Sequence, residues 1–414
     1  MPDPASTRLF RARTIVPISS PAIADGALAL RDGEILAVGR WEDLLGEHPA
    51  ATREDLGEVI VMPGLINAHC HLDYTMMRGA LFGGGSFSAW IQRLNSMRRS
   101  LDQRDYLDAI ASGLSELRRW GCTTVLNIES FPELVPFLPD APIRVWWFLE
   151  VLDVRSRLES AESLAGAIHF FERAGESRGG FGISPHAPYT VSRDLYTLSA
   201  SFAGKYHLPL CTHLAESDEE MAMFAEGKGP LHDFLQSIGR PMDDCGGKTP
   251  VEAVLGEGLL PEGSLLVHMN MLTEGDKELL RSTAGKYPVI HCPRTHAFFG
   301  RAPFDLRFCR ESGIPVLIGT DSLASNEDLN MFSEMRAMQS AFPDLDPREI
   351  LTMVTVAPAA AIGRKGRLGE LSPGALADFL TLPDEGEGSV DEKTLAERIL
   401  ANRTPPDVWI SGRR

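Results

Sequence analysis

The feature that most constrains the fold is a regular alternation of short apolar runs with amphipathic segments across residues 59–366. The apolar runs have the length and composition of buried strands. They are Val59–Met62, Thr123–Ile128, Ile143–Leu149, Phe181–Ser184, Leu208–Thr212, Ser264–Val267, Pro288–Ile290 and Pro315–Ile318. Segments with helical spacing separate most of them, at 106–120, 161–174, 193–203, 274–284 and 326–342. Eight strands alternating with helices predict an α/β fold, a (β/α)8 TIM-type barrel with its chemistry at the carboxyl ends of the strands.

The two ends of the chain predict a second, smaller domain. Within residues 1–58 an Asp32-Gly33 pair separates two apolar runs, which is typical of a β-hairpin. Residues 374–382 and 407–412 are also strand-like. Because chain termini often lie close together, we expect residues 1–58 and 367–414 to form one composite β-domain, a small β-sandwich. Residues 59–366 would then form the barrel.

The amino-acid composition limits the classes of binding partner and the cellular compartment that we expect. The net charge of -17 argues against nucleic acid or an anionic membrane as a partner and favours a small-molecule substrate. The 6 cysteines are scattered without a C-x-x-C pair, which is typical of a reducing compartment. The N-terminus lacks a signal-peptide pattern, and no apolar run is long enough to span a bilayer. We therefore expect a cytoplasmic globular protein of the size of an enzyme.

The first expected strand leads into His69 and His71, one residue apart. In a strand, residues i and i+2 point to the same face, so these two imidazoles suit a shared metal ion. For this motif taken alone, a pair of ordinary core or surface histidines is the alternative.

Further metal-binding side chains follow the other expected strands. They are His186, His213, His268, His291 and Asp321. A hydrolytic zinc site needs nitrogen and oxygen ligands and one open position for water. His69, His71 and His213 can supply the nitrogens and Asp321 the oxygen. Taken singly, His213 could be a core histidine and Asp321 a helix cap.

Glu216 follows His213 by three residues. If a helix begins at His213, the two side chains share a face. A carboxylate beside an activated water is a natural proton shuttle. The alternative is a solvated acid in the acidic run 216–220.

These motifs together resemble the amidohydrolase superfamily. The matching segments are 63–71, 186–190, 212–216, His268, 291–293 and 319–322. The resemblance implies one divalent metal, zinc in preference to iron, held by His69, His71, His213 and Asp321. It implies Glu216 as proton shuttle, His268 as the residue that polarises the water or stabilises the tetrahedral intermediate, and Asp321 as acceptor of the water's proton. No lysine ends the fourth strand, which favours a single metal.

The closest branch is similar to chlorohydrolases, guanine and cytosine deaminases, and S-adenosylhomocysteine/methylthioadenosine deaminases. The segment His291–Gly300 departs from the S-adenosylhomocysteine deaminase pattern and is more similar to aminodeoxyfutalosine deaminases of menaquinone synthesis. That substrate is an adenine nucleoside with an added benzoate.

Several side chains could contact such a substrate. Arg294 could pair with its carboxylate, although a loop salt bridge would also explain this arginine. Trp90 or Phe299 could stack on a ring, although core packing would explain the phenylalanine. His186 would face the substrate by resemblance. Further candidates are His296 and Ser322.

Three functions remain open at this point. The first is an adenine-nucleoside aminohydrolase. The second is another hydrolase of the same fold, such as a triazine chlorohydrolase, a guanine-type deaminase or a cyclic amidase. The third is a non-enzymatic metal-binding protein, which the intact set of site residues disfavours. Relatives of this kind often form homodimers, but the sequence reveals no interface.

Overall fold

The computed structural model describes residues 7–138, 140–154, 159–173, 178–283, 285–384, 386 and 391–414. The chain divides into two compact units. The first contains Met1–Asn67, Ser115–Val125 and Asn330–Arg414, and the second contains Ala68–Leu114 and Leu126–Leu329.

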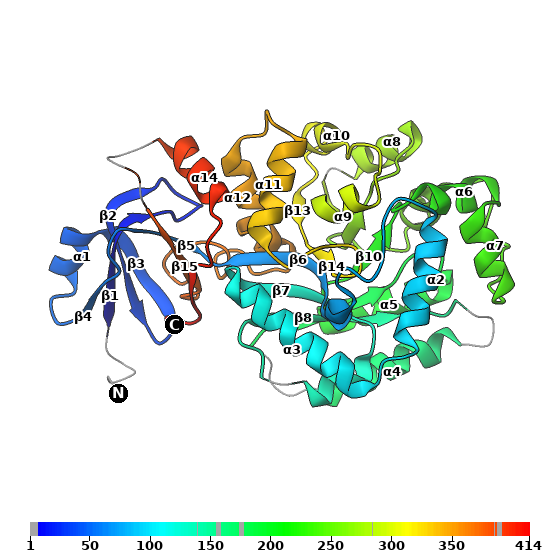
Figure 1. Ribbon diagram of the computed structural model, residues 1–414, viewed down its shortest axis with the longest axis horizontal. Helices are drawn as coiled ribbons and strands as arrows, with labels where there is room; N and C mark the ends of the chain where they lie inside the picture. The colour runs from blue at the N-terminus through cyan, green and yellow to red at the C-terminus, as the bar shows by residue number, and fades with distance from the viewer. Residues whose placement is uncertain are drawn as a thin grey trace. The chain divides into compact units, whose positions relative to one another are not determined.

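A seven-stranded sheet in the first unit joins strands from both ends of the chain (Figure 1). Its strands are β1 (Arg8–Ile15), β2 (Ile23–Arg31), β3 (Glu34–Arg40), β4 (Thr52–Asp55), β5 (Val59–Pro63), β15 (Phe379–Pro383) and β16 (Asp407–Trp409). They follow the order β16-β15-β5-β1-β2-β3, with β4 paired to β1. The predicted hairpin is confirmed: β2 and β3 pair antiparallel, and Asp32 and Gly33 between them have φ angles of 52° and 81°. Two consecutive positive φ angles match the right-handed twist of a hairpin.

Three aromatic rings hold the terminal strands of this sheet together. Phe10 lies on β1, Phe379 on β15 and Trp409 on β16, and all three are buried. The Phe379 ring stacks on Trp409 with centroids 5.3 Å apart, and Phe10 meets both rings edge-on at 5.8 and 5.2 Å. Aromatic burial of this kind is a large stabilising term, so the sheet depends on residues from opposite chain ends.

The barrel strands are close to those predicted, with one correction. They are β6 (Leu65–His71), β7 (Cys122–Glu129), β8 (Arg144–Val151), β9 (Gly180–Pro185), β10 (Cys211–Leu214), β11 (Leu265–His268), β12 (Val289–His291) and β13 (Val316–Ile318). The expectation that Val59–Met62 is the first barrel strand is wrong. This run forms β5, which pairs with β1 and β15, and the chain resumes after Gly64 as β6.

The eight strands close into a ring. Neighbours from β6 to β9 and from β10 to β13 are hydrogen-bonded, and a parallel bridge between Ile183 and Leu210 joins β9 to β10. A short strand, β14 (Asp321–Ser322), continues β13 and pairs in parallel with Cys70 and His71 of β6. The carboxyl ends of all eight strands therefore surround one mouth, where barrel enzymes place their chemistry.

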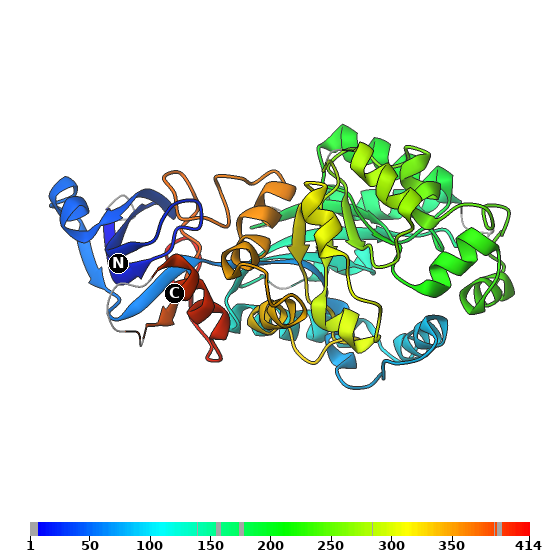
Figure 2. The same cartoon turned by 90° about the horizontal axis from the view of Figure 1, so that it is seen from above.

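Helices of the second unit lie on the outside of the barrel strands (Figure 1 and Figure 2), whereas the helix at Trp41–Glu47 packs against β2 and β3 of the terminal sheet. The α-helices are α1 (Trp41–Glu47), α2 (Phe87–Arg98), α3 (Gln103–Arg119), α4 (Ser160–Arg173), α5 (Arg193–Tyr206), α6 (Asp218–Glu226), α7 (Pro230–Ser237), α8 (Glu274–Ser282), α9 (Pro293–Phe298), α10 (Leu306–Glu311), α11 (Met331–Ala341), α12 (Pro347–Met353), α13 (Val356–Ala361) and α14 (Glu392–Ala401). Short 3₁₀ helices occupy Leu72–Met77 and Pro132–Phe137, and a π-helical turn occupies Glu252–Gly256.

The helix predicted over 326–342 begins only at Met331, because the Asn330 side chain accepts the backbone N–H of Phe332 and caps the helix there. Among the described residues, none of the helices is both long and apolar enough to cross a membrane.

We predict that Phe379→Ala lowers the free energy of unfolding by about 3–5 kcal/mol, because it removes a buried ring and leaves a cavity between two others. Urea denaturation followed by tryptophan fluorescence measures this. Phe137→Ala is the matched control, since that side chain is 62% exposed and should change stability by less than about 0.5 kcal/mol. Equal effects of the two substitutions would contradict this account of the sheet.

Candidate active site

The first two site residues come from one strand. His69 and His71 end β6, their rings lie on the same face with centroids 4.9 Å apart, and both are buried. This is the geometry expected for residues i and i+2 of a strand.

Other strand ends bring the remaining predicted ligands to the same place. The Nε2 atom of His213, on β10, lies 3.4 Å from Nε2 of His71. The Oδ1 atom of Asp321, on β14, lies 3.6 Å from Nε2 of His69 and 3.9 Å from Nε2 of His71. Four side chains from three distant parts of the sequence therefore converge at one point of the barrel mouth.

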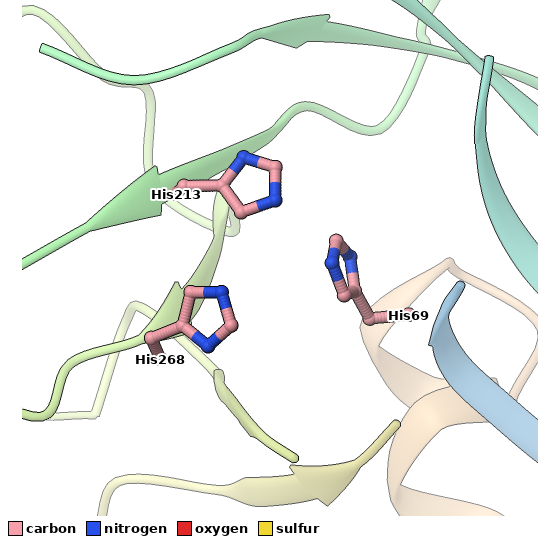
Figure 3. A group of neighbouring side chains, drawn as sticks. All are labelled: His69, His213 and His268. Carbon is pink, nitrogen blue, oxygen red and sulfur yellow. The ribbon is translucent and has the colours of Figure 1, made fainter. Parts of the chain in front are cut away.

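His268 completes this group. Figure 3 shows His69, His213 and His268 directed toward one another from β6, β10 and β11, with ring centroids 5.0 to 6.0 Å apart. In the triads His69–His213–His268 and His69–His71–Asp321, the possible ligand atoms all lie within 4.8 Å of one another.

The protonation of these groups fits a divalent cation. Burial lowers the pKa of His69, His71 and His268, so each is a neutral imidazole with a lone pair to donate. Burial alone would raise the pKa of Asp321, but its hydrogen bond and charge interaction with His69 outweigh burial and lower the pKa. Asp321 is therefore ionised.

Neighbouring groups orient these donors. Nδ1 of His213 donates to the carbonyl of His186 at 3.0 Å, which leaves its Nε2 free to donate a lone pair. The backbone N–H of Ser322 holds Oδ1 of Asp321 at 2.8 Å. Within the described residues, Nδ1 of His71 is buried without a hydrogen-bond partner. The other ring nitrogen of His71, Nε2, faces His213 and Asp321 and is the atom that would bind a metal ion.

Glu216 lies beside this group, but for a different reason than predicted. Helix α6 begins at Asp218, capped by the side chain of Ser217, so Glu216 and His213 do not share a helical face. Glu216 lies in the loop after β10, where Ala215 has a φ angle of 51°. Its Oε1 atom lies 3.8 Å from Nε2 of His268, within reach of the same reacting group.

A cavity of about 870 Å³ opens beside these residues. Its polar part is lined by His71, His186, His213, Glu216, His268 and Asp321. Its apolar wall comes mainly from helices α2 and α7. Of the predicted substrate contacts, Trp90, His186, Phe299 and Ser322 line this cavity.

Two predicted substrate contacts are not brought to the cavity. Arg294 donates to Oδ1 of Asp328 at 2.5 Å and to Oε2 of Glu327 at 2.9 Å, which is the loop salt bridge considered above. His296 interacts through Nδ1 with Oδ1 of Asn270 at 3.1 Å. Neither Arg294 nor His296 is among the described residues that line the cavity. The cause is helix α9, which begins directly after β12 and carries both side chains to other partners.

Three residues at or next to the cavity are not predicted from the sequence: Glu150, Arg98 and Arg301. Glu150 is the penultimate residue of β8, lines the cavity, and has a carboxylate oxygen within 4.8 Å of ring nitrogens of His186 and His213. Burial raises its pKa. An acid that interrupts an apolar run at a strand end was a usable signal for Glu150. Arg98 on α2 and Arg301 after α9 had no such signal, because only tertiary structure brings them here.

The sequence profile of the amidohydrolase family matches residues 60–414 of this chain. The chain belongs to the amidohydrolase family. A second profile, described as an imidazolonepropionase-like composite domain of bacteria, matches residues 26–51. The site residues named above all lie within the first match.

Two curated relatives are similar over most of their length. The 5-methylthioadenosine/S-adenosylhomocysteine deaminase of Nitratidesulfovibrio vulgaris is 32% identical over 87% of this chain and 80% of its own. The aminodeoxyfutalosine deaminase of Deinococcus radiodurans is 31% identical over 80% of this chain and 79% of its own. Among solved structures, Helicobacter pylori aminofutalosine deaminase in complex with methylthio-coformycin is 22% identical, covers 98% of this chain and 99% of its own, and has a TM-score of 0.87. This structure shows that the amidohydrolase fold is shared.

We predict that His213→Asn lowers zinc affinity by more than about 100-fold, because it removes from the centre of the cluster a nitrogen that we expect to bind the metal. Zinc titration with a competing chelator measures this. His207→Asn is the matched control: His207 is exposed and has a φ angle of 54°, which asparagine also tolerates. If His213→Asn bound zinc as tightly as His207→Asn, His213 would not be a ligand.

Proposed function

We propose that this amidohydrolase is a metal-dependent aminohydrolase that acts on the C–N bond of a cyclic amidine. It replaces the exocyclic amino group of an adenine-type nucleoside and releases ammonia. The observation that carries the proposal is the convergence of three imidazoles and Asp321 at the barrel mouth, with Glu216 beside them and a large cavity in front.

The proposed cofactor is one divalent ion, zinc in preference to iron, held by His69, His71, His213 and Asp321. A set of three nitrogens and one oxygen suits zinc or a similar borderline cation. When bound, such an ion lowers the pKa of a coordinated water to about 7 and so supplies a nucleophile at neutral pH.

The side chains then divide the proton transfers between them. Asp321 is ionised and accepts the proton of the attacking water. His268, held neutral by burial, orients and polarises that water. Glu216 delivers a proton to the ring nitrogen next to the attacked carbon. The proton that Asp321 has accepted then passes to the amino group, which leaves as ammonia, and the new hydroxyl group returns a proton to Glu216 as it becomes the carbonyl oxygen of the product.

The first candidate substrate is 6-aminodeoxyfutalosine, an intermediate of menaquinone synthesis. The cavity of about 870 Å³ has room for a large substituent beyond the purine, and Trp90 and Phe299, whose ring centroids are 5.2 Å apart, supply aromatic faces at its wall. Two curated relatives named aminodeoxyfutalosine deaminase support this choice. S-adenosylhomocysteine and methylthioadenosine are the second candidates, because they are named for other relatives. Guanine and chlorinated triazines are further alternatives.

Three further properties belong to the same proposal. Residues 1–58 and 367–414 form a composite β-sandwich domain, and residues 59–366 form the barrel. The terminal sheet shared by both chain ends and the profile match over 26–51 support this division. Strand β5 and parts of the first compact unit, however, fall inside 59–366. The enzyme is cytoplasmic, which its 6 free cysteines support. It acts as a homodimer on a small molecule.

We predict ammonia release, with the absorbance change from adenine to hypoxanthine, on aminodeoxyfutalosine and more slowly on methylthioadenosine, S-adenosylhomocysteine or adenosine. The zinc-loaded protein is assayed against this panel, with guanine and a chlorotriazine added. Turnover of guanine or the triazine alone would replace the adenine-nucleoside assignment, and no turnover of any compound would contradict the aminohydrolase.

We predict that Glu216→Gln keeps the fold and the metal but lowers kcat by about 10²–10⁴-fold, because it removes the proton shuttle. Steady-state kinetics and metal analysis of the same preparation measure both properties. Glu226→Gln is the control, since Glu226 ends α6 and pairs with Lys228 in solvent. Undiminished turnover by Glu216→Gln would remove Glu216 from the mechanism.

A further inference from the structure

Arg301 holds the carboxylate of Glu216. Its Nη2 atom lies 3.0 Å from Oε1 of Glu216, and its Nη1 atom donates to the backbone carbonyl of the same residue. Both side chains are almost fully buried, at 9% and 8% exposure. A buried planar guanidinium that bonds one residue at two points fixes the position and the orientation of that residue.

Aromatic rings hold Arg301 itself in place. Its Cζ atom lies 4.6 Å from the ring centroid of Phe299 and 5.4 Å from that of Phe87. Both phenylalanines line the cavity, whereas Arg301 is not among the described residues that do so. Arg301 therefore contacts the proton shuttle without contacting the space where a substrate would bind.

Further hydrogen bonds hold the backbone of the loop that carries Glu216. Nδ2 of Asn270 donates to the carbonyl of Glu216 at 3.1 Å, and Oδ1 of Asn270 accepts from Nδ1 of His296 at 3.1 Å. The backbone N–H groups of Ala215 and Glu216 donate to the carboxylate of Glu220 at 3.2 and 2.6 Å. The backbone at Glu216 is thus held at its nitrogen and at its oxygen, and His296 serves this network.

The second carboxylate oxygen of Glu216, Oε2, is the one available for proton transfer. Oε1 is placed between Arg301 and His268. Within the described part of the chain, Oε2 has no hydrogen bond or ion pair, and Glu216 lines the cavity. A proton shuttle works only when the transferring oxygen is held at hydrogen-bonding distance from the group it serves.

We propose that Arg301 is a positioning residue, which fixes Oε1 of Glu216 so that Oε2 carries the proton to and from the substrate. This inference rests on the proposed function, because it assigns Arg301 to the shuttle of the deamination. The role of Arg301 can nevertheless be tested separately from the activity, since it concerns only the orientation of the Glu216 carboxylate.

The test uses Arg301→Met in the full-length, zinc-loaded protein, because methionine keeps apolar contact with the two phenylalanines and removes the charge. We expect kcat to fall about 100-fold, with KM changed less than threefold and zinc content unchanged, and Arg301→Lys to recover part of kcat. The matched control is Arg307→Met, which removes the same charge from a side chain that is 87% exposed and pairs with Glu311. It should retain the kcat of the wild type.

A crystal structure of Arg301→Met provides a readout that does not depend on turnover. The expected result is a Glu216 carboxylate that is rotated or disordered, with the four metal ligands in place. A Glu216 carboxylate unchanged in position, or a kcat equal to that of Arg307→Met, would overturn the role of Arg301. If the wild type itself turns over nothing, the proposed function fails, and the crystal structure still decides whether Arg301 positions Glu216.

Discussion

The structure depends on the burial of several imidazoles and one carboxylate around a single point. Burial keeps His69, His71 and His268 neutral, and contact with His69 keeps Asp321 ionised. Neutral nitrogens and an anionic oxygen facing one another in a desolvated site are costly unless something positive lies between them. A divalent cation satisfies all of them at once, which is why the same arrangement explains both the stability of the site and its chemistry.

The barrel makes this arrangement possible because it brings remote strand ends to one mouth. The ring closes where β14 pairs with β6, which places Asp321 opposite Cys70 and beside the two histidines of β6. Gly319 allows this approach, since a Cβ atom there would lie 2.7 Å from Cβ of His69. The ligand cluster is therefore a consequence of how the ring closes.

The sequence predicted the barrel strands after the first and the side chains that converge at their ends, because strand periodicity and apolar runs fix where a side chain leaves the barrel. It misplaced Val59–Met62, since an apolar run does not reveal which sheet it joins. It also assigned Arg294 and His296 to the substrate. Their true partners, Asp328 and Asn270, are set by the direction of α9. The contact between Arg301 and Glu216 joins residues 85 positions apart and leaves no local pattern in the sequence.

The most direct test of the central claim is anomalous diffraction at the zinc absorption edge from crystals of the zinc-loaded protein. The account predicts one strong peak at about 2.0–2.2 Å from Nε2 of His69, His71 and His213 and from a carboxylate oxygen of Asp321. A peak held instead by Glu150 and His186, or no peak within reach of the His69 and His71 rings, would contradict it.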